Sequence, residues 1–275
     1  MRLPDGAAAV VALTLVVLVS GCSRLSFVKP SAARGSSEQV AQTYDFSDDK
    51  RNRNGAGNAR AHLLRGEQAL REGRAADARE QARLALKADA GDPLAHTLMA
   101  LALERQGQAG EAGGYYARAA ELAPASGPAL NNYGSWLCLN GRAPESLDWF
   151  DRALADRSYA SPESALANAG ACAVEGGQPG RAERDLRAAL RLDPMNAVAL
   201  EALARHLYGQ GKHFEARAFS QRRLDAASAT PAALLLASQI EEKLGDKAAA
   251  ARYVQRLRTE FPQAQAALPG DSSSR

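Results

Sequence analysis

This 275-residue chain contains three cysteines and four histidines, the side chains that take part in the widest range of reactions and bonds. Thiols can be acylated, oxidised to a disulfide or bound to a metal, and imidazoles act as bases or metal ligands. The cysteines are Cys22, Cys138 and Cys172, and the histidines are His62, His96, His206 and His213. No Cys-x-x-Cys pair and no His-Glu-x-x-His or other metal spacing occurs among them. We therefore expect neither a redox catalyst nor a metal site.

Other catalytic and nucleotide-binding motifs are also missing from the sequence. It contains no Gly-x-x-x-x-Gly-Lys-Ser/Thr loop for phosphates and no Gly-x-Ser-x-Gly turn for a nucleophilic serine. Its 34 lysine and arginine residues are balanced by 31 acidic residues, and the basic residues are scattered rather than clustered. Nucleic-acid binding needs a concentrated basic surface. The sequence thus predicts a non-enzymatic protein with no cofactor, no small-molecule substrate and no nucleic-acid partner.

Cys22 lies directly after an apolar segment at the start of the chain. Residues 7–19 are apolar apart from Thr14, and this segment is too short to span a bilayer but typical of a signal-peptide core. The junction Val19-Ser20-Gly21-Cys22 resembles a bacterial lipobox, at which the thiol is acylated and the chain is cut before the cysteine. Residues 1–21 are then a lipoprotein signal peptide. The alternative is an ordinary cleaved signal peptide with a cysteine nearby by chance.

Acylation of Cys22 would decide where the protein works. Each buried acyl CH₂ contributes about 0.8 kcal/mol, so two or three chains hold a protein firmly on a membrane. Ser23 follows the cysteine, which matches the sorting preference for the outer membrane. We therefore expect a lipid-anchored protein on the periplasmic face of the outer membrane. Residues 22–58 are polar with little apolar periodicity, and we expect a flexible tether with a reach of roughly 30 Å.

The rest of the chain repeats at an interval of 34 residues. Small residues recur at this spacing, as in Gly66, Ala100 and Gly134, and the pattern continues with a two-residue insertion near Ser161-Pro162. Glycines mark the middle of each unit at Gly73, Gly107, Gly141, Gly176-Gly177, Gly211 and Gly245, and prolines close several units at Pro124, Pro194 and Pro262. The pattern is that of tetratricopeptide repeats, in which small residues let two helices pack closely.

Six such units fit the sequence. Their ranges are 59–92, 93–126, 127–160, 163–196, 197–230 and 231–264, which leaves residues 265–275 as a disordered tail. The predicted fold is all-α, with about six antiparallel helix pairs stacked into a right-handed superhelix. Arg223 stands where alanine is usual, which makes the fifth unit less regular.

Cys138 and Cys172 lie on the first helices of units three and four. Since these helices are neighbours in such a superhelix, the two thiols can meet, and an oxidising periplasm favours a disulfide. Two buried free thiols are the alternative.

The first helices of such repeats line a concave groove, which suits a peptide segment of another protein. The positions that usually face the groove include Leu63, Glu67, Leu70, Leu94, Thr97, Leu101, Asn131, Ser135 and Leu139. Glu201, Arg205 and Tyr208 hold such positions in unit five. For Leu63, Leu70 and Leu101 the alternative is packing between units.

Units three and four carry a more particular pattern. Residues 131–138 read Asn-Asn-Tyr-Gly-Ser-Trp-Leu-Cys, and residues 159–163 read Tyr-Ala-Ser-Pro-Glu. With the lipobox and the cysteine pair, this resembles the PilF/PilW family of type IV pilus biogenesis lipoproteins. The resemblance implies lipidation at Cys22 and pairing of Cys138 with Cys172.

The resemblance also implies a function. Members of this kind bind the pilus secretin and help it to reach the outer membrane and to multimerise. A different envelope scaffold, acting as an adaptor for other cell-envelope assemblies, is the alternative hypothesis.

Overall fold

The computed structural model describes residues 56–267 of the chain. Within this range every regular element is helical, with twelve α-helices and one short 3₁₀ helix. The all-α prediction is therefore confirmed. Cys22, the signal peptide and most of the predicted tether lie outside the described residues, as does the end of the predicted tail.

The twelve α-helices form six pairs, each with a first and a second helix. The pairs are α1 (Ala56–Arg71) with α2 (Ala75–Ala88), α3 (Pro93–Arg105) with α4 (Ala109–Leu122), α5 (Gly127–Leu139) with α6 (Ala143–Ala155), α7 (Pro162–Glu175) with α8 (Pro179–Leu192), α9 (Ala197–Gly209) with α10 (His213–Ala226), and α11 (Pro231–Leu244) with α12 (Lys247–Glu260). Each predicted unit corresponds to one pair, although α1 begins three residues before position 59 and α7 one residue before position 163. The 3₁₀ helix η1 (Pro262–Ala267) follows α12.

The turn inside each pair depends on one glycine. Six glycines have φ between +67° and +82°, a region that side chains with a Cβ atom rarely adopt. They are Gly73, Gly107, Gly141, Gly177, Gly211 and Gly245. All six are at the predicted turn positions, and in repeat four the second glycine of the pair takes the left-handed conformation. The glycines therefore set the short turns that let the two helices of a pair run antiparallel.

The connections between pairs use different signals. Side chains of Asp92, Ser126, Asn196 and Thr230 accept hydrogen bonds from backbone N–H groups in the first turn of the following helix. Such caps satisfy donors that have no partner inside the helix. The predicted terminating prolines each stand two residues after a second helix ends, as Pro124 does after Leu122. The second helices are 13 or 14 residues long, and one of these caps or prolines follows each of them except α6.

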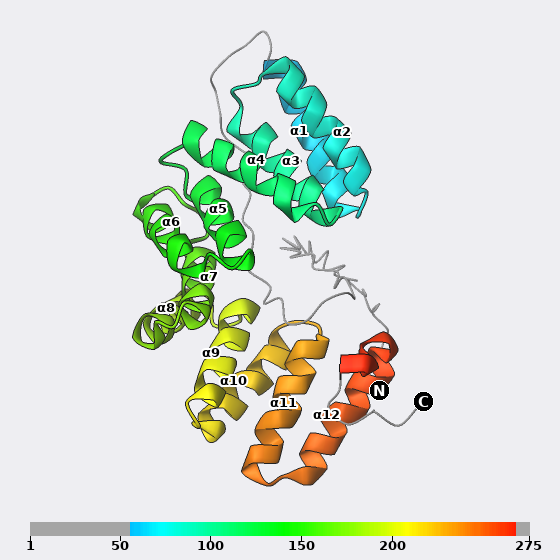
Figure 1. Ribbon diagram of the computed structural model, residues 1–275, viewed down its shortest axis with the longest axis vertical. Helices are drawn as coiled ribbons and strands as arrows, with labels where there is room; N and C mark the ends of the chain where they lie inside the picture. The colour runs from blue at the N-terminus through cyan, green and yellow to red at the C-terminus, as the bar shows by residue number, and fades with distance from the viewer. Residues whose placement is uncertain (1–55, 268–275) are drawn as a thin grey trace, which may run out of the picture.

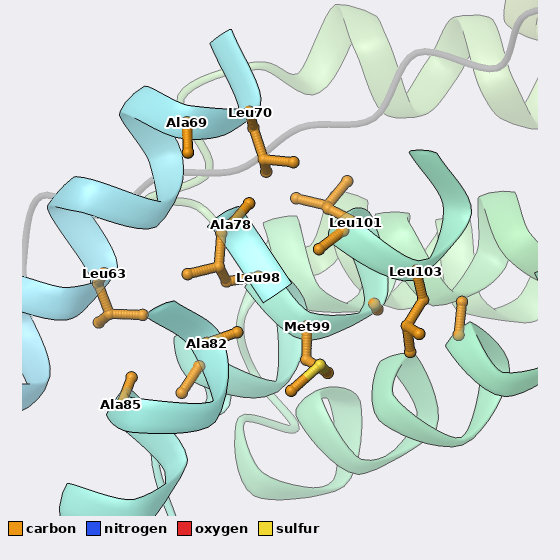
Figure 2. Close-up of a cluster of buried hydrophobic side chains, with 14 of the residues drawn as sticks. Leu63, Ala69, Leu70, Ala78, Ala82, Ala85, Leu98, Met99, Leu101 and Leu103 are labelled. Atoms are coloured by element: carbon orange, nitrogen blue, oxygen red, sulfur yellow. The ribbon is translucent and has the colours of Figure 1, made fainter. Parts of the chain in front are cut away.

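Small side chains bring the helices of a repeat close together. Figure 2 shows the core of the first two repeats, where alanines of α2 face leucines of α1 and α3. Ala78, Ala82 and Ala85 are fully buried. A Cβ added at Gly66 would lie 2.4 Å from a methyl group of Leu98, so this site admits only glycine unless Leu98 moves. The predicted role of the repeated small residues is therefore confirmed in this core.

The repeats stack along a curved path, from α1 and α2 at one end to α11 and α12 at the other (Figure 1). Each second helix packs against the first helix of the next repeat. First helices of consecutive repeats also contact one another, whereas second helices in the described part of the chain do not to a comparable extent. The first helices therefore form the inner side of the curve.

Two boundaries differ from the predicted ones. Helix α1 begins at Ala56, inside the predicted tether. Ala59 and Leu63 are buried, and residues 56–58 extend the same helix by almost one turn toward the N-terminus. At the other end, η1 continues to Ala267 and packs on α12, so residues 265–267 do not belong to a disordered tail. No described helix is both long and apolar enough to cross a bilayer.

Candidate functional site: the inner face of the helix stack

The inner face of the first helices is the candidate binding surface, but most of the predicted groove residues are buried beneath it. Six of the nine are at most 6% exposed. They are Leu63, Leu70, Thr97, Leu101, Asn131 and Ser135. These side chains cannot reach a partner in this structure. We therefore correct their assignment from groove residues to packing residues.

Contacts between neighbouring first helices explain the burial. Leu63, Leu70 and Leu101 belong to the hydrophobic core of the first two repeats (Figure 2), which was the alternative for these three positions. Thr97 turns its hydroxyl back onto the helix and donates to the carbonyl oxygen of Pro93 at 2.9 Å. The close approach of α1 to α3 and of α3 to α5 thus covers positions that an isolated repeat would expose.

Asn131 and Ser135 are buried in a group of polar side chains that hydrogen-bond to one another. Both lie on α5 and face Asn168 of α7, which is also fully buried. The Asn168 side-chain amide donates to Oδ1 of Asn131 at 3.0 Å and to Oγ of Ser135 at 3.2 Å. Because buried polar groups cost free energy without partners, these bonds fix how α5 sits against α7.

A disulfide continues the same line of contacts. Cys138 lies one turn beyond Ser135 on α5, and Cys172 lies one turn beyond Asn168 on α7. Their sulfurs are bonded, with the Cα atoms 5.8 Å apart, so the predicted pair is formed in the structure. The bond closes a loop of one repeat, since the two cysteines are 34 positions apart. We call this line of amide, hydroxyl and disulfide contacts the α5–α7 seam.

Three predicted groove residues keep some access to solvent. Leu139 at the end of α5 is 41% exposed, and Leu94 at the start of α3 is partly buried. The Glu67 side chain is 17% exposed and forms an ion pair with Arg71 one turn along α1. The accessible part of the predicted groove is therefore narrower than the sequence suggests, and these three positions stay candidates for contact with a partner.

The inner face of repeat five is charged rather than apolar. Glu201 on α9 receives a hydrogen bond from Arg223 Nε at 2.9 Å and lies 3.4 Å from Arg205 on its own helix. Arg223 is 4% exposed and also donates to the carbonyl oxygens of Ala227 and Ser228. This explains the arginine at an alanine position: it caps the C-terminal end of α10 and anchors that helix to α9.

The histidines do not form a metal site. Within residues 56–267, no group of three or more histidine, cysteine and acidic side chains is arranged to hold a metal. His206 is buried, and burial lowers its pKa while the nearby Glu183 carboxylate opposes this effect. The Gln210 side-chain nitrogen lies 2.9 Å from Nε2 of His206, which fits a neutral ring that accepts at Nε2. These contacts assign His206 to the packing of α9.

An aromatic group between repeats two and three was not predicted as part of any site. The Trp136 indole covers Gly113 of α4 so closely that a Cβ there would lie 2.1 Å from the ring, and its Nε1 donates to the Ala109 carbonyl oxygen. Tyr133 packs edge-on against Trp149 with ring centroids 4.7 Å apart. Glycine at 113 and tryptophan at 136 are the sequence signals of this contact, but no spacing rule pairs them.

Taken together, the six helix pairs and the packing of their first helices define a helical-repeat protein. The tetratricopeptide repeat family matches residues 50–93, 97–164 and 172–229. The chain belongs to the tetratricopeptide repeat family.

Two solved structures align with this chain over nearly all of their own length. PilW, described as a widely conserved type IV pilus biogenesis factor, is 28% identical with a TM-score of 0.69, covering 76% of this chain and 97% of PilW. PilF of Pseudomonas aeruginosa is 22% identical with a TM-score of 0.66, covering 76% of this chain and 95% of PilF. The chain is thus a PilF/PilW-like repeat protein, as its sequence pattern predicts.

Similarity of fold alone does not fix the function. The Cut9–Hcn1 tetramer of the APC/C is only 13% identical, yet its TM-score is 0.64 over 73% of this chain and 39% of that chain. No curated protein matches the chain by sequence.

Proposed function

We propose that this chain is a non-enzymatic outer-membrane lipoprotein of type IV pilus biogenesis. It binds the pilus secretin and promotes the secretin's localisation to the outer membrane and its multimerisation. The observation that carries this proposal is the similarity to PilW, which extends over 97% of PilW at 28% identity. An unrelated scaffold with the same fold shares the helix arrangement but much less of the sequence.

The repeat architecture supports binding rather than catalysis. The described residues hold no cluster of metal-ligating side chains, and the buried histidine and cysteines serve packing and cross-linking. A curved stack of helices instead offers an extended inner face. Leu94, Leu139 and the partly exposed Glu67 are the positions on that face from which we expect contacts with a secretin segment.

A lipid anchor at Cys22 adds a second component to the mechanism. The acyl chains hold the protein on the membrane, and residues 22–58 separate the anchor from most of the helix stack. Confining the binding surface and the secretin to one membrane raises their effective concentration without any new contact. Lipidation therefore matters most where the secretin is scarce or assembles slowly.

The test is secretin assembly in cells that lack this protein, complemented with wild type or with Cys22→Ala. Heat- and detergent-resistant secretin multimers and their membrane fraction are measured. We expect multimers to be lost or to collect in the inner membrane, and only wild type to restore them. Equal abundance of the two complementing proteins is the control.

Two outcomes separate the parts of the proposal. If multimers assemble and localise normally without the protein, the secretin function fails, and the alternative of a scaffold for other envelope assemblies takes its place. If Cys22→Ala restores assembly as well as wild type does, the binding function stands and the lipid anchor fails.

A further inference from the structure

Among residues 56–267, α12 is the one second helix that does not pack against the first helix of a following repeat, and only η1 contacts it from the C-terminal side. Helices α2, α4, α6, α8 and α10 each pack against the first helix of the following repeat. In the described part of the chain, α12 is followed only by the six residues of η1 (Figure 1). One side of α12 is therefore built like an interface between repeats but has no further repeat against it.

The equivalent side of α4 shows how such a helix receives a side chain from the next repeat. On α4, the ring of Trp136 from the next repeat lies on Gly113, and Ala120 is buried in a cluster with Leu130 of the next repeat. The equivalent residues of α12 are Ala251 and Arg258, and Val254 lies one turn beyond Ala251. Ala251 is exposed and Val254 is partly exposed. The exposed Ala251 thus occupies the position at which Gly113 of α4 receives the Trp136 ring.

This side of α12 is also hollowed. A depression of about 570 Å³ lies here, and Ala250, Ala251 and Val254 provide its apolar lining. Lys247 and Arg258 also line it, near opposite ends of the helix. These two residues are eleven positions apart, which corresponds to about 16 Å along a helix. The depression therefore has the length of three turns of a helix and an apolar centre.

The charge of α12 indicates what binds there. The helix carries four basic residues, Lys247, Arg252, Arg256 and Arg258, and the single acidic residue Glu260. Glu242 of α11 is the one carboxylate among the residues that line the depression. At the depression itself, the two basic residues Lys247 and Arg258 stand against this one carboxylate, and Arg256 is paired with Glu260. The remaining positive charge favours a partner that carries carboxylates.

A second copy of the chain is a poor occupant. To extend the stack end to end, α1 of one copy would have to pack on α12 of another. Helix α1 carries three arginines and one glutamate, so both ends of the described stack are positive and repel each other. The charge pattern therefore favours a helix from a different protein.

We propose that this side of α12 is a docking site for an acidic amphipathic helix of another protein. A large apolar side chain of that helix lies on Ala251 and Val254, as Trp136 lies on Gly113. Carboxylates of the helix lie near Lys247 and Arg258. The inference rests on the helix stack alone and does not depend on the proposed role in pilus biogenesis.

The first experiment measures binding of a defined probe to the chain from Ser23 to Arg275, which keeps every described residue. The probe is a stapled, fluorescein-labelled peptide of about 14 residues, with a central tryptophan and glutamates about 11 positions apart on one face. Fluorescence anisotropy gives the affinity. We expect Ala251→Glu to weaken binding at least tenfold, because it places a carboxylate in the depression.

The matched control is Ala218→Glu, which makes the same change at an exposed alanine of α10 away from the depression. It should leave binding within twofold of wild type, and both variants should keep the wild-type circular dichroism spectrum and unfolding midpoint. A peptide with lysines in place of the glutamates should bind at least tenfold more weakly. Equal binding to wild type and Ala251→Glu, or equal binding of the two peptides, overturns the proposal.

The second experiment identifies the occupant in cells. A photo-crosslinking amino acid replaces Gln255, an exposed residue that lines the depression, and the cross-linked peptide is sequenced. The proposal predicts an acidic, helix-forming segment of another protein, lost in the Ala251→Glu variant. Cross-links only to a second copy, only within the same chain, or to nothing contradict it.

Discussion

Repeats three and four are joined by a different chemistry from repeats five and six. The α5–α7 seam is held by the Asn168 amide and by the bond between Cys138 and Cys172. Between repeats five and six, Arg217 of α10 instead pairs with the buried carboxylate of Glu241 on α11. Both junctions arise from the same 34-residue pattern. The pattern therefore sets where helices meet, while individual side chains decide how firmly they are held.

This difference has a consequence for binding. A covalent bond and buried amides are insensitive to salt, so the middle of the stack keeps its curvature under most conditions. An ion pair with a partly exposed partner is weakened by salt and yields more easily to a competing charge. We expect the middle of the inner face to act as a fixed platform and the last repeats to adapt to partners.

Loss of the disulfide should have the largest effect on stability. Replacing Cys138 and Cys172 together by serine should lower the free energy of unfolding by about 3–4 kcal/mol, because the unfolded chain regains the entropy of a loop of one repeat. Urea unfolding followed by circular dichroism measures it. Reductant should destabilise wild type but not the double variant. If reductant changes neither, the two thiols are free in solution.

Removing the Asn168 amide should have the second largest effect on stability. Asn168→Ala takes away the donor that Asn131 and Ser135 share, and we expect a loss of about 2–3 kcal/mol from the free energy of unfolding. Asn140→Ala is the matched control, because this exposed side chain bonds only a carbonyl of its own helix and should cost under about 0.5 kcal/mol. Equal losses for the two variants would mean that the seam adds nothing.

Breaking the ion pair between Arg217 and Glu241 should lower the free energy of unfolding by a smaller amount, and the loss should depend on salt. Glu241→Gln should cost about 1–2 kcal/mol at low salt, since Glu241 is buried while the Arg217 side chain is 30% exposed. In about 1 M salt, where the Debye length is about 3 Å, the difference from wild type should shrink. Glu260→Gln breaks an exposed pair with Arg256 and should cost under about 0.5 kcal/mol at any salt. A salt-independent loss in Glu241→Gln would argue for packing rather than charge.

The smallest effect should come from His206. Burial holds its pKa below the ordinary value of 6.5, so the unfolded chain binds a proton before the folded chain does. Stability is therefore fully present above pH 6.5 and falls as the pH drops from 6.5 toward the lowered pKa. Unfolding free energies at pH 7.5 and 5.5 test this. His206→Gln should flatten the dependence; a slope equal to that of wild type contradicts the assignment.

The helix pairs could be predicted from the sequence because they follow from local rules. Glycines such as Gly73 and Gly141 adopt φ values that other residues avoid, and alanines such as Ala78 leave room for a neighbouring helix. Both signals depend on residue type and spacing, which the sequence states directly. The sequence favoured a bond between Cys138 and Cys172 because they lie on neighbouring first helices, but it left two free thiols as the alternative, and the structure has the bond.

Exposure on the inner face could not be predicted in the same way. Whether Thr97 or Ser135 faces solvent depends on how closely first helices of consecutive repeats approach, and that distance depends on the curvature of the whole stack. Arg223 shows a second limit. Its position predicted an irregular repeat, but its partners include Glu201 and the backbone beyond α10, which only the folded chain brings together.

We propose above that the inner face of the first helices binds the pilus secretin. The most direct test of this proposal is hydrogen exchange of the purified chain, measured alone and with the purified secretin. We expect slower exchange in the first helices near Leu94 and Leu139, with exchange in α2, α4 and α6 unchanged. Unchanged exchange throughout, or slower exchange confined to α2, α4 and α6, would contradict the proposal.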